Sequence, residues 1–106
     1  MKIYIDISVF LRQERSLGQI FGNIELPCVP SIGARISFSA PFAGAIPFFC
    51  DGFSGALKIT DVQFVANSGS DSVVVSLEDL VLSSESDGKA VMEYLRAGFA
   101  LFVDKA

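Results

Sequence analysis

The chain contains 106 residues, of which 51% are hydrophobic and 19% are charged, with a formal net charge of −4 and no histidine. This composition fits a single domain over residues 1–106 and excludes an intrinsically disordered chain, which requires low hydrophobicity and high net charge. The acidic balance argues against nucleic-acid binding, because a phosphate backbone selects a surface rich in Lys and Arg. The missing histidine removes every catalytic or metal-binding arrangement that depends on an imidazole.

The two cysteines and the uncharged stretches indicate the cellular location of the protein. Cys28 and Cys50 form no CxxC pair. We therefore expect both to be small buried hydrophobic residues, with a disulfide between them only in an exported protein. Asp6 interrupts the apolar stretch at the N-terminus, which argues against a signal peptide. The longest uncharged stretch, 36–50, is too short to span a bilayer. The sequence thus predicts a cytoplasmic protein that does not bind a membrane.

The first part of the chain predicts three strands. Residues 2–11 place isoleucine, valine or leucine at every second position, which is typical of a half-buried strand. A polar connection over 12–18 leads to a second strand over 19–26. There, Gly22 occupies an inward position and indicates a bulge or the close approach of another backbone. A turn with two prolines and a glycine then leads to a third strand over 34–40.

The second part predicts two or three strands and a helix. Within 57–66 the apolar positions change phase at Asp61, which indicates a β-bulge. After a turn over 67–71, a strand over 72–78 continues towards Leu82 through a second irregularity near Asp79. Helical spacing predicts a helix over 87–97, with Gly98 as its C-cap, and then a short strand over 99–103. The predicted fold is mainly β (α+β): a small antiparallel sheet or partly open β-barrel of five to six strands with one C-terminal helix.

The search for catalytic, cofactor-binding or metal-binding residues finds none to propose. The acidic residues at 78, 79, 85 and 87 lack the spacing of a calcium loop, and solvated acids at a strand end and a helix start explain them better. Cys50 lies beside Asp51 and far from any cation in sequence, which disfavours a reactive thiolate. Asp61 is the carboxylate of most interest, since bulges occur near active sites, although an exposed aspartate is commoner. We expect no cofactor.

Residues 42–53 form the most unusual segment. It contains no Lys, Arg or Glu, and its large apolar residues are Phe42, Ile46, Phe48, Phe49 and Phe53. One interpretation is that these side chains cover an open end of the sheet and belong to the core. The other is that some stay exposed and contact a partner. The first interpretation is slightly favoured, and homodimerisation is the leading functional option.

Two functions follow from this pattern. The first is a non-enzymatic interaction or assembly module that contacts itself or another protein through the 42–53 loop. The alternative is a small-ligand-binding domain or minor enzyme with a site in the mouth of the barrel, near Asp61, Glu78 or Arg35. We favour the first, because the chain lacks the usual catalytic side chains.

Overall fold

The computed structural model describes residues 1–12, 15–42, 46–67 and 73–106. The described residues are mainly β with one helix near the C-terminus, as predicted. The elements are β1 (Lys2–Leu11), β2 (Arg15–Glu25), β3 (Arg35–Ser37), β4 (Ala56–Phe64), β5 (Val73–Leu77), β6 (Leu80–Leu82), α1 (Glu85–Phe99) and β7 (Phe102–Lys105). Apart from Asn67, the predicted turn over 67–71 lies outside the described residues, as do Ser72 and parts of the predicted connections at 12–18 and 41–55.

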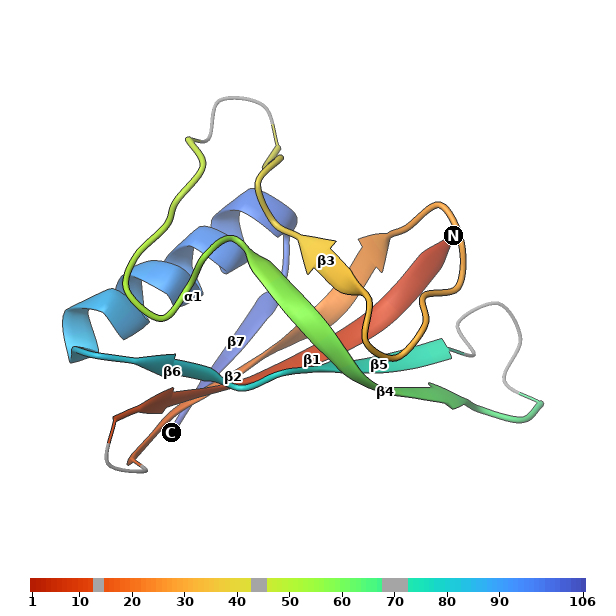
Figure 1. Cartoon of the computed structure of the whole chain (residues 1–106), viewed down its shortest axis with the longest axis horizontal. Coiled ribbons are helices and arrows are strands. Elements are labelled where there is room, and N and C mark those ends of the chain that lie inside the picture. Colours follow the sequence, from red (N-terminus) through yellow and green to blue (C-terminus); the bar gives the residue numbers. More distant parts are fainter. Residues whose placement is uncertain (13–14, 43–45, 68–72) are drawn as a thin grey trace.

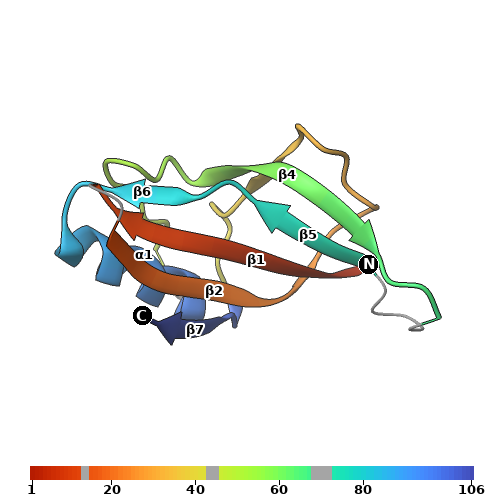
Figure 2. The same ribbon diagram turned by 90° about the horizontal axis from the view of Figure 1, so that it is seen from below.

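The strands form one mixed sheet that is not closed into a barrel. Their order is β3-β4-β5-β1-β2-β7, and β6 pairs with β1 beyond the end of β5 (Figure 2). Four pairings are antiparallel, but β5 and β6 run parallel to β1. The expectation of an antiparallel sheet of five to six strands is therefore wrong in these two pairings and in the strand number. Alternation reports which face a side chain occupies and carries no information about the direction of the neighbouring strand.

One face of the central strand β1 is fully buried from Ile3 to Val9. The strand predicted over 2–11 is confirmed, and Ile3, Ile5, Ile7 and Val9 of β1 all have 0% exposure. The alternate residues of β1 face the other side of the sheet. Of these, Lys2 is exposed and the others are half-buried: Tyr4, Asp6, Ser8 and Phe10. The apolar face of β1 therefore needs a cover, and the rest of the chain supplies it.

Helix α1 covers only part of that face. It begins after Ser84, whose hydroxyl accepts a hydrogen bond from the Asp87 N–H, and it buries Val91, Met92 and Leu95 against the sheet. Its fifteen residues span about 22 Å, and a helix is about 10–12 Å wide. At about 4.8 Å between strands, six adjacent strands extend about 24 Å across. The helix accordingly contacts β1, β2, β6 and β7, and it leaves β3, β4 and β5 to another segment (Figure 1).

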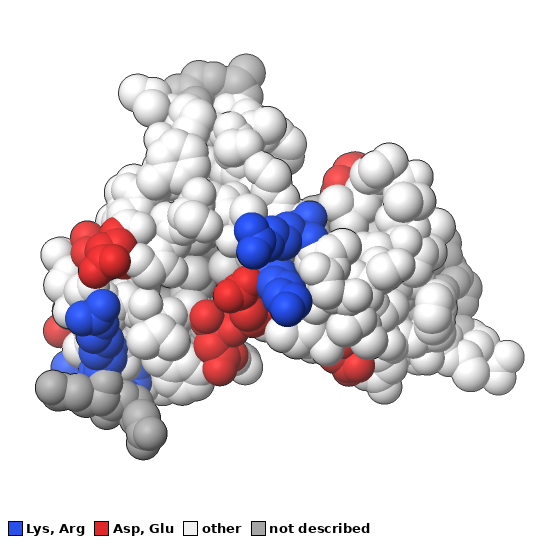
Figure 3. Space-filling model, viewed as in Figure 1, with Lys and Arg blue, Asp and Glu red and all other residues white. Residues whose placement is uncertain are grey.

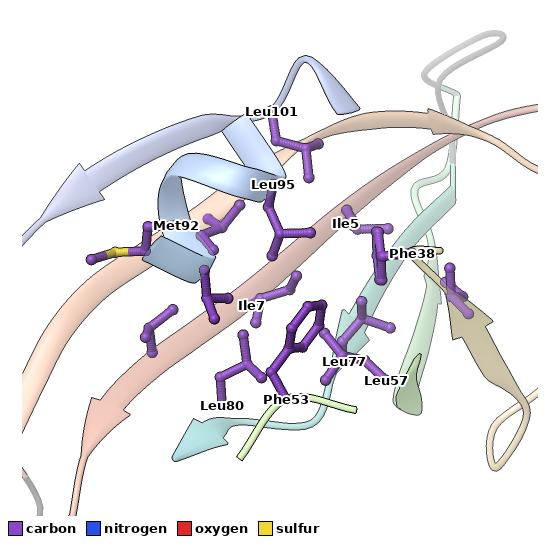
Figure 4. Close-up of a cluster of buried hydrophobic side chains, with 14 of the residues drawn as sticks. Ile5, Ile7, Phe38, Phe53, Leu57, Leu77, Leu80, Met92, Leu95 and Leu101 are labelled. Atoms are coloured by element: carbon purple, nitrogen blue, oxygen red, sulfur yellow. The ribbon is translucent and has the colours of Figure 1, made fainter. Parts of the chain in front are cut away.

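The segment between β3 and β4 covers the remaining part of the face. Phe38 and Phe53 are each 1% exposed and lie beside Leu57 and Leu77 in the core (Figure 4). Two hydrogen bonds attach this segment to α1: the Tyr94 hydroxyl donates to the Phe38 carbonyl, and the Phe42 N–H donates to the Gly98 carbonyl at 2.9 Å. The core therefore has a helical cover at one end of the sheet and a non-helical cover at the other.

Both predicted irregularities in the later strands are confirmed. The β4–β5 register shifts between Ile59 and Asp61, and residues 78–79 separate β5 from β6. Despite this break, β5 and β6 both pair with β1.

Several predicted boundaries differ from the structure. β2 begins at Arg15, so residues 15–18 of the predicted connection extend the hairpin, and β3 is confined to Arg35–Ser37. β7 lies at Phe102–Lys105 rather than 99–103, because α1 continues to Phe99. Gly98 is not the C-cap. It lies within α1, where an added Cβ would be 3.0 Å from Pro41 Cβ, and Ala100 adopts the left-handed cap conformation.

The glycines of β2 permit a close approach by the C-terminal part of the chain. At Gly22, an added Cβ would lie 3.0 Å from Leu101 Cδ2 and 3.6 Å from Leu101 Cα, which confirms the predicted close approach. Gly18 is tighter, since an added Cβ would lie 2.4 Å from the Asp104 carbonyl oxygen of β7. The positive φ values of +144° and +142° also favour glycine at both positions.

We predict that Gly18→Ala lowers the free energy of unfolding more than Gly33→Ala does. Both substitutions strain a positive φ, at a cost of about 1–3 kcal/mol. Only Gly18 also meets a neighbouring backbone oxygen, whereas an added Cβ at Gly33 has nothing within 4 Å. Urea unfolding of the two variants measures the difference. Equal losses would show that β7 does not pack against Gly18.

Candidate functional site

The five candidate residues of the 42–53 segment divide into two groups. Phe53 is 1% exposed and belongs to the core, and Phe48 is half-buried against it. By contrast, Phe42, Ile46 and Phe49 are 64%, 83% and 54% exposed. Neither interpretation of the segment therefore applies to all five residues: two cover the core and three face solvent.

Aromatic contacts with α1 explain the buried group. The rings of Phe48 and Phe53 lie 5.9 and 6.2 Å from the ring of Tyr94, measured between centroids. The Phe38 ring makes an edge-to-face contact with Phe99 at 5.2 Å, and Phe99 contacts Tyr94 at 5.7 Å. Such pairs each contribute about 0.5–1.5 kcal/mol beyond the area they bury. The cluster therefore fixes both ends of the segment against one side of the helix.

Two members of the exposed group, Phe42 and Phe49, lie on or beside hydrogen-bonded backbone. The Phe42 N–H is bonded to α1 as described above, and Cys50 and Phe53 exchange two backbone hydrogen bonds of 3.1 and 3.0 Å. The Phe49 ring lies across Gly55, where an added Cβ would be 2.4 Å from Phe49 Cε1. We call Phe42, Ile46 and Phe49 the exposed loop residues. No charged residue occurs between Arg35 and Asp51 in the sequence, and the upper lobe in Figure 3 is correspondingly free of charge on the face shown.

Two adjacent grooves flank β3 at the open end of the sheet, and both are lined by Leu26, Ile36 and Ser37. The first has a volume of about 390 Å³ and extends to Phe38, Phe42 and Phe99. Two charged residues, Lys2 and Glu25, also line it. The second has a volume of about 400 Å³ and runs under the turn after β2. Of the three polar residues expected around a ligand site, Arg35 lines the second groove, while Asp61 and Glu78 line neither. We refer to the pair as the β3 grooves.

Two of the four acidic residues considered as metal ligands have local partners instead. Glu85 forms ion pairs with Arg15 and Lys89, and a Glu78 carboxylate oxygen accepts a 2.5 Å hydrogen bond from the Lys58 N–H. In the part of the chain that the structure describes, no group of three or more Cys, Asp or Glu side chains could hold a metal ion. The same part contains no helix long and apolar enough to cross a membrane.

The cysteines are both free thiols, in different surroundings. Cys28 is exposed in the turn after β2, so the expectation that it is buried is wrong. The prolines on either side restrict this turn and favour a surface path for its backbone. Cys50 is half-buried against the core. Burial raises the pKa of its thiol, the carboxylates of Asp87 and Asp51 raise that pKa further, and a hydrogen bond from the Phe53 backbone partly offsets them.

Comparisons with known proteins found no matching family model, no matching curated protein and no matching solved structure.

We predict that Phe53→Ala destabilises the fold by about 3–5 kcal/mol, the usual loss for a buried phenylalanine. Phe49→Ala removes the same atoms from the same segment at a position that is 54% exposed, so its effect is smaller by at least half. Chemical denaturation of the two variants provides the comparison. Equal destabilisation would contradict the division of the segment into covering and exposed residues.

We further predict that Cys50 ionises above its ordinary pH range in the native protein. The Cys28→Ser variant leaves Cys50 as the remaining thiol, and its reaction rate with a disulfide reagent follows the thiolate fraction. Because the pKa is raised, the midpoint of the rate–pH profile shifts to higher pH than for the same variant unfolded in urea. A native midpoint at or below the unfolded one would contradict the environment described for Cys50.

Proposed function

We propose that this protein is a non-enzymatic interaction module that self-associates through the exposed loop residues. The observation that carries the proposal is the exposure of three large apolar side chains within residues 42–49, which carry no charge: Phe42 at 64%, Ile46 at 83% and Phe49 at 54%. Removing apolar surface from water is favourable by about 25 cal/mol per Å². Fully burying one such side chain therefore contributes about 1.5–3 kcal/mol to association.

The anchoring of the segment supports binding through these residues. Association loses free energy when it orders mobile loops. Here the backbone of Phe42 is bonded to α1, and the bridge between Cys50 and Phe53 closes the other end of the segment. Phe48 and Phe53 take no part in the proposed contact, since the core already uses them.

The charge distribution restricts where a second copy of the chain can bind. Each copy carries a formal net charge of −4, so two copies repel each other over most of their surfaces. Residues 42–49 carry no charge, so this repulsion is smallest there. An apolar surface is also self-complementary, as the twofold interface of a homodimer requires.

A cytoplasmic location is part of the same proposal. Both cysteines are free, which accords with a reducing compartment.

Size-exclusion chromatography with light scattering over a range of concentrations tests the proposal. We expect a dimer for the native chain and a monomer for the triple variant Phe42→Ser, Ile46→Ser, Phe49→Ser. The matched control is Val81→Ser with Phe102→Ser, which removes two residues that are 49% and 64% exposed on strands, and it should remain dimeric. A native chain that stays monomeric, or a triple variant that still dimerises, would refute the proposal.

A further inference from the structure

We propose that the outer edge of β3 binds an extended segment of a partner protein in which acidic and apolar residues alternate. The proposed contact lies beside β3 and adds a strand to the sheet, a common mode of peptide recognition. It is separate from the self-association proposed above, and only Phe42 borders both surfaces.

The backbone of β3 has hydrogen-bonding groups available on its outer edge. β3 is the last strand on its side of the sheet, and β4 is its neighbour on the inner side. The Ile59 N–H donates to the Ala34 carbonyl at 2.8 Å, and the Phe38 N–H donates to the Gly55 carbonyl at 2.6 Å. Backbone groups alternate in direction along an antiparallel pair, so those of Arg35 and Ser37 point away from β4. An extended segment beside β3 would receive hydrogen bonds from both residues.

The grooves provide space for the apolar side chains of such a segment. Ile36 is 7% exposed and faces the core side of β3, and it lines both β3 grooves. In a paired strand, residues opposite one another share a face. Every second side chain of the bound segment would therefore enter an apolar groove of about 400 Å³, within the size range of natural binding pockets.

The charges around β3 indicate acidic residues at the other positions. Arg35 pairs in register with Lys58 of β4, and both side chains are exposed on the outer face. Lys2 lines one of the grooves. Within the described residues these three cations form no ion pair, whereas four others do: Arg12, Arg15, Lys89 and Arg96.

The nearby carboxylates leave these cations available to a ligand. Glu25 is paired with the amino group of Met1 at 3.1 Å, and Glu78 accepts the Lys58 N–H. Figure 3 shows Lys and Arg side chains in the hollow between the two lobes, with acidic side chains directly below them. In a chain of net negative charge, the exposed neighbours Arg35 and Lys58 favour an acidic ligand beside β3.

Binding of a synthetic peptide to the full chain tests the proposal. The probe is a blocked peptide of alternating Glu and Val, and the control peptide has Lys in place of Glu. Calorimetry gives the affinity, and amide chemical shifts locate the binding site. We expect the Glu-Val peptide to bind at least about tenfold more tightly than the Lys-Val peptide and to shift the amides of 34–38.

Two variants test the role of the β3 edge. Ser37→Pro removes the outward N–H and leaves the bonds to β4, which use the residues on either side of it. Arg35→Glu reverses the charge without altering the backbone, so it tests the β3 edge even if the proline variant fails to fold. Each should weaken Glu-Val binding by about tenfold: Ser37→Pro because one backbone hydrogen bond is lost, and Arg35→Glu because the reversed charge repels the acidic peptide. Lys105→Glu, at the opposite edge of the sheet, is the matched control and should bind normally.

Three results would overturn the proposal: no binding of the Glu-Val peptide, equal binding of the two peptides, or normal binding by both folded β3 variants. Repeating the titration with Ile46→Ser, Phe49→Ser, which changes two exposed loop residues and no residue of the β3 grooves, separates the two proposals. Normal Glu-Val binding by this double variant supports the β3 site independently of self-association. Loss of binding in the double variant would show that the loop, and not the β3 edge, carries the interaction.

Discussion

The one-sided burial of β1 is the constraint on which the rest of the structure depends. Four β-branched side chains on one face of this strand, at 3, 5, 7 and 9, have 0% exposure, so the sheet requires a continuous cover over that face. A single helix is too narrow to provide it, because a helix covers about two strand spacings and the sheet is six strands wide. The 38–55 segment completes the cover, and Tyr94 joins the two parts through its ring and its hydroxyl.

This division of the cover also determines which surfaces remain available. Phe38 and Phe53 are buried because they reach over β4 and β5, whereas the exposed loop residues extend beyond the area that the sheet needs covered. At the open end, β3 has only three residues and a neighbour on one side, so its outer edge and the grooves beside it stay open. The short length of β3 limits uncontrolled pairing of that edge, a common protection of exposed strands. The two proposed interaction surfaces therefore lie at the limits of the cover: the exposed loop residues extend beyond it, and the outer edge of β3 has no neighbouring strand.

Much of the local structure was predictable from the sequence, because side-chain alternation records burial directly. The face of β1, the bulge at Asp61, the break at 78–79 and the close approach at Gly22 were all visible as period or phase. The parallel pairing of β5 and β6 with β1 was not, since alternation is the same in either direction. Nor could the sequence show which phenylalanines of 42–53 are buried. That depends on where Tyr94 of α1 lies in space, and the segment itself has no period from which burial could be inferred.

Proton–proton NOEs between aromatic rings report directly whether the loop forms part of the core cover. The arrangement predicts NOEs from the Tyr94 ring to the rings of Phe48 and Phe53, and from Phe99 to Phe38, in the native chain. The rings of Phe42 and Phe49 should give weaker contacts, in keeping with their exposure. If the rings of Phe48 and Phe53 show no NOE to Tyr94, the loop does not cover the sheet, and the account given for both surfaces is contradicted.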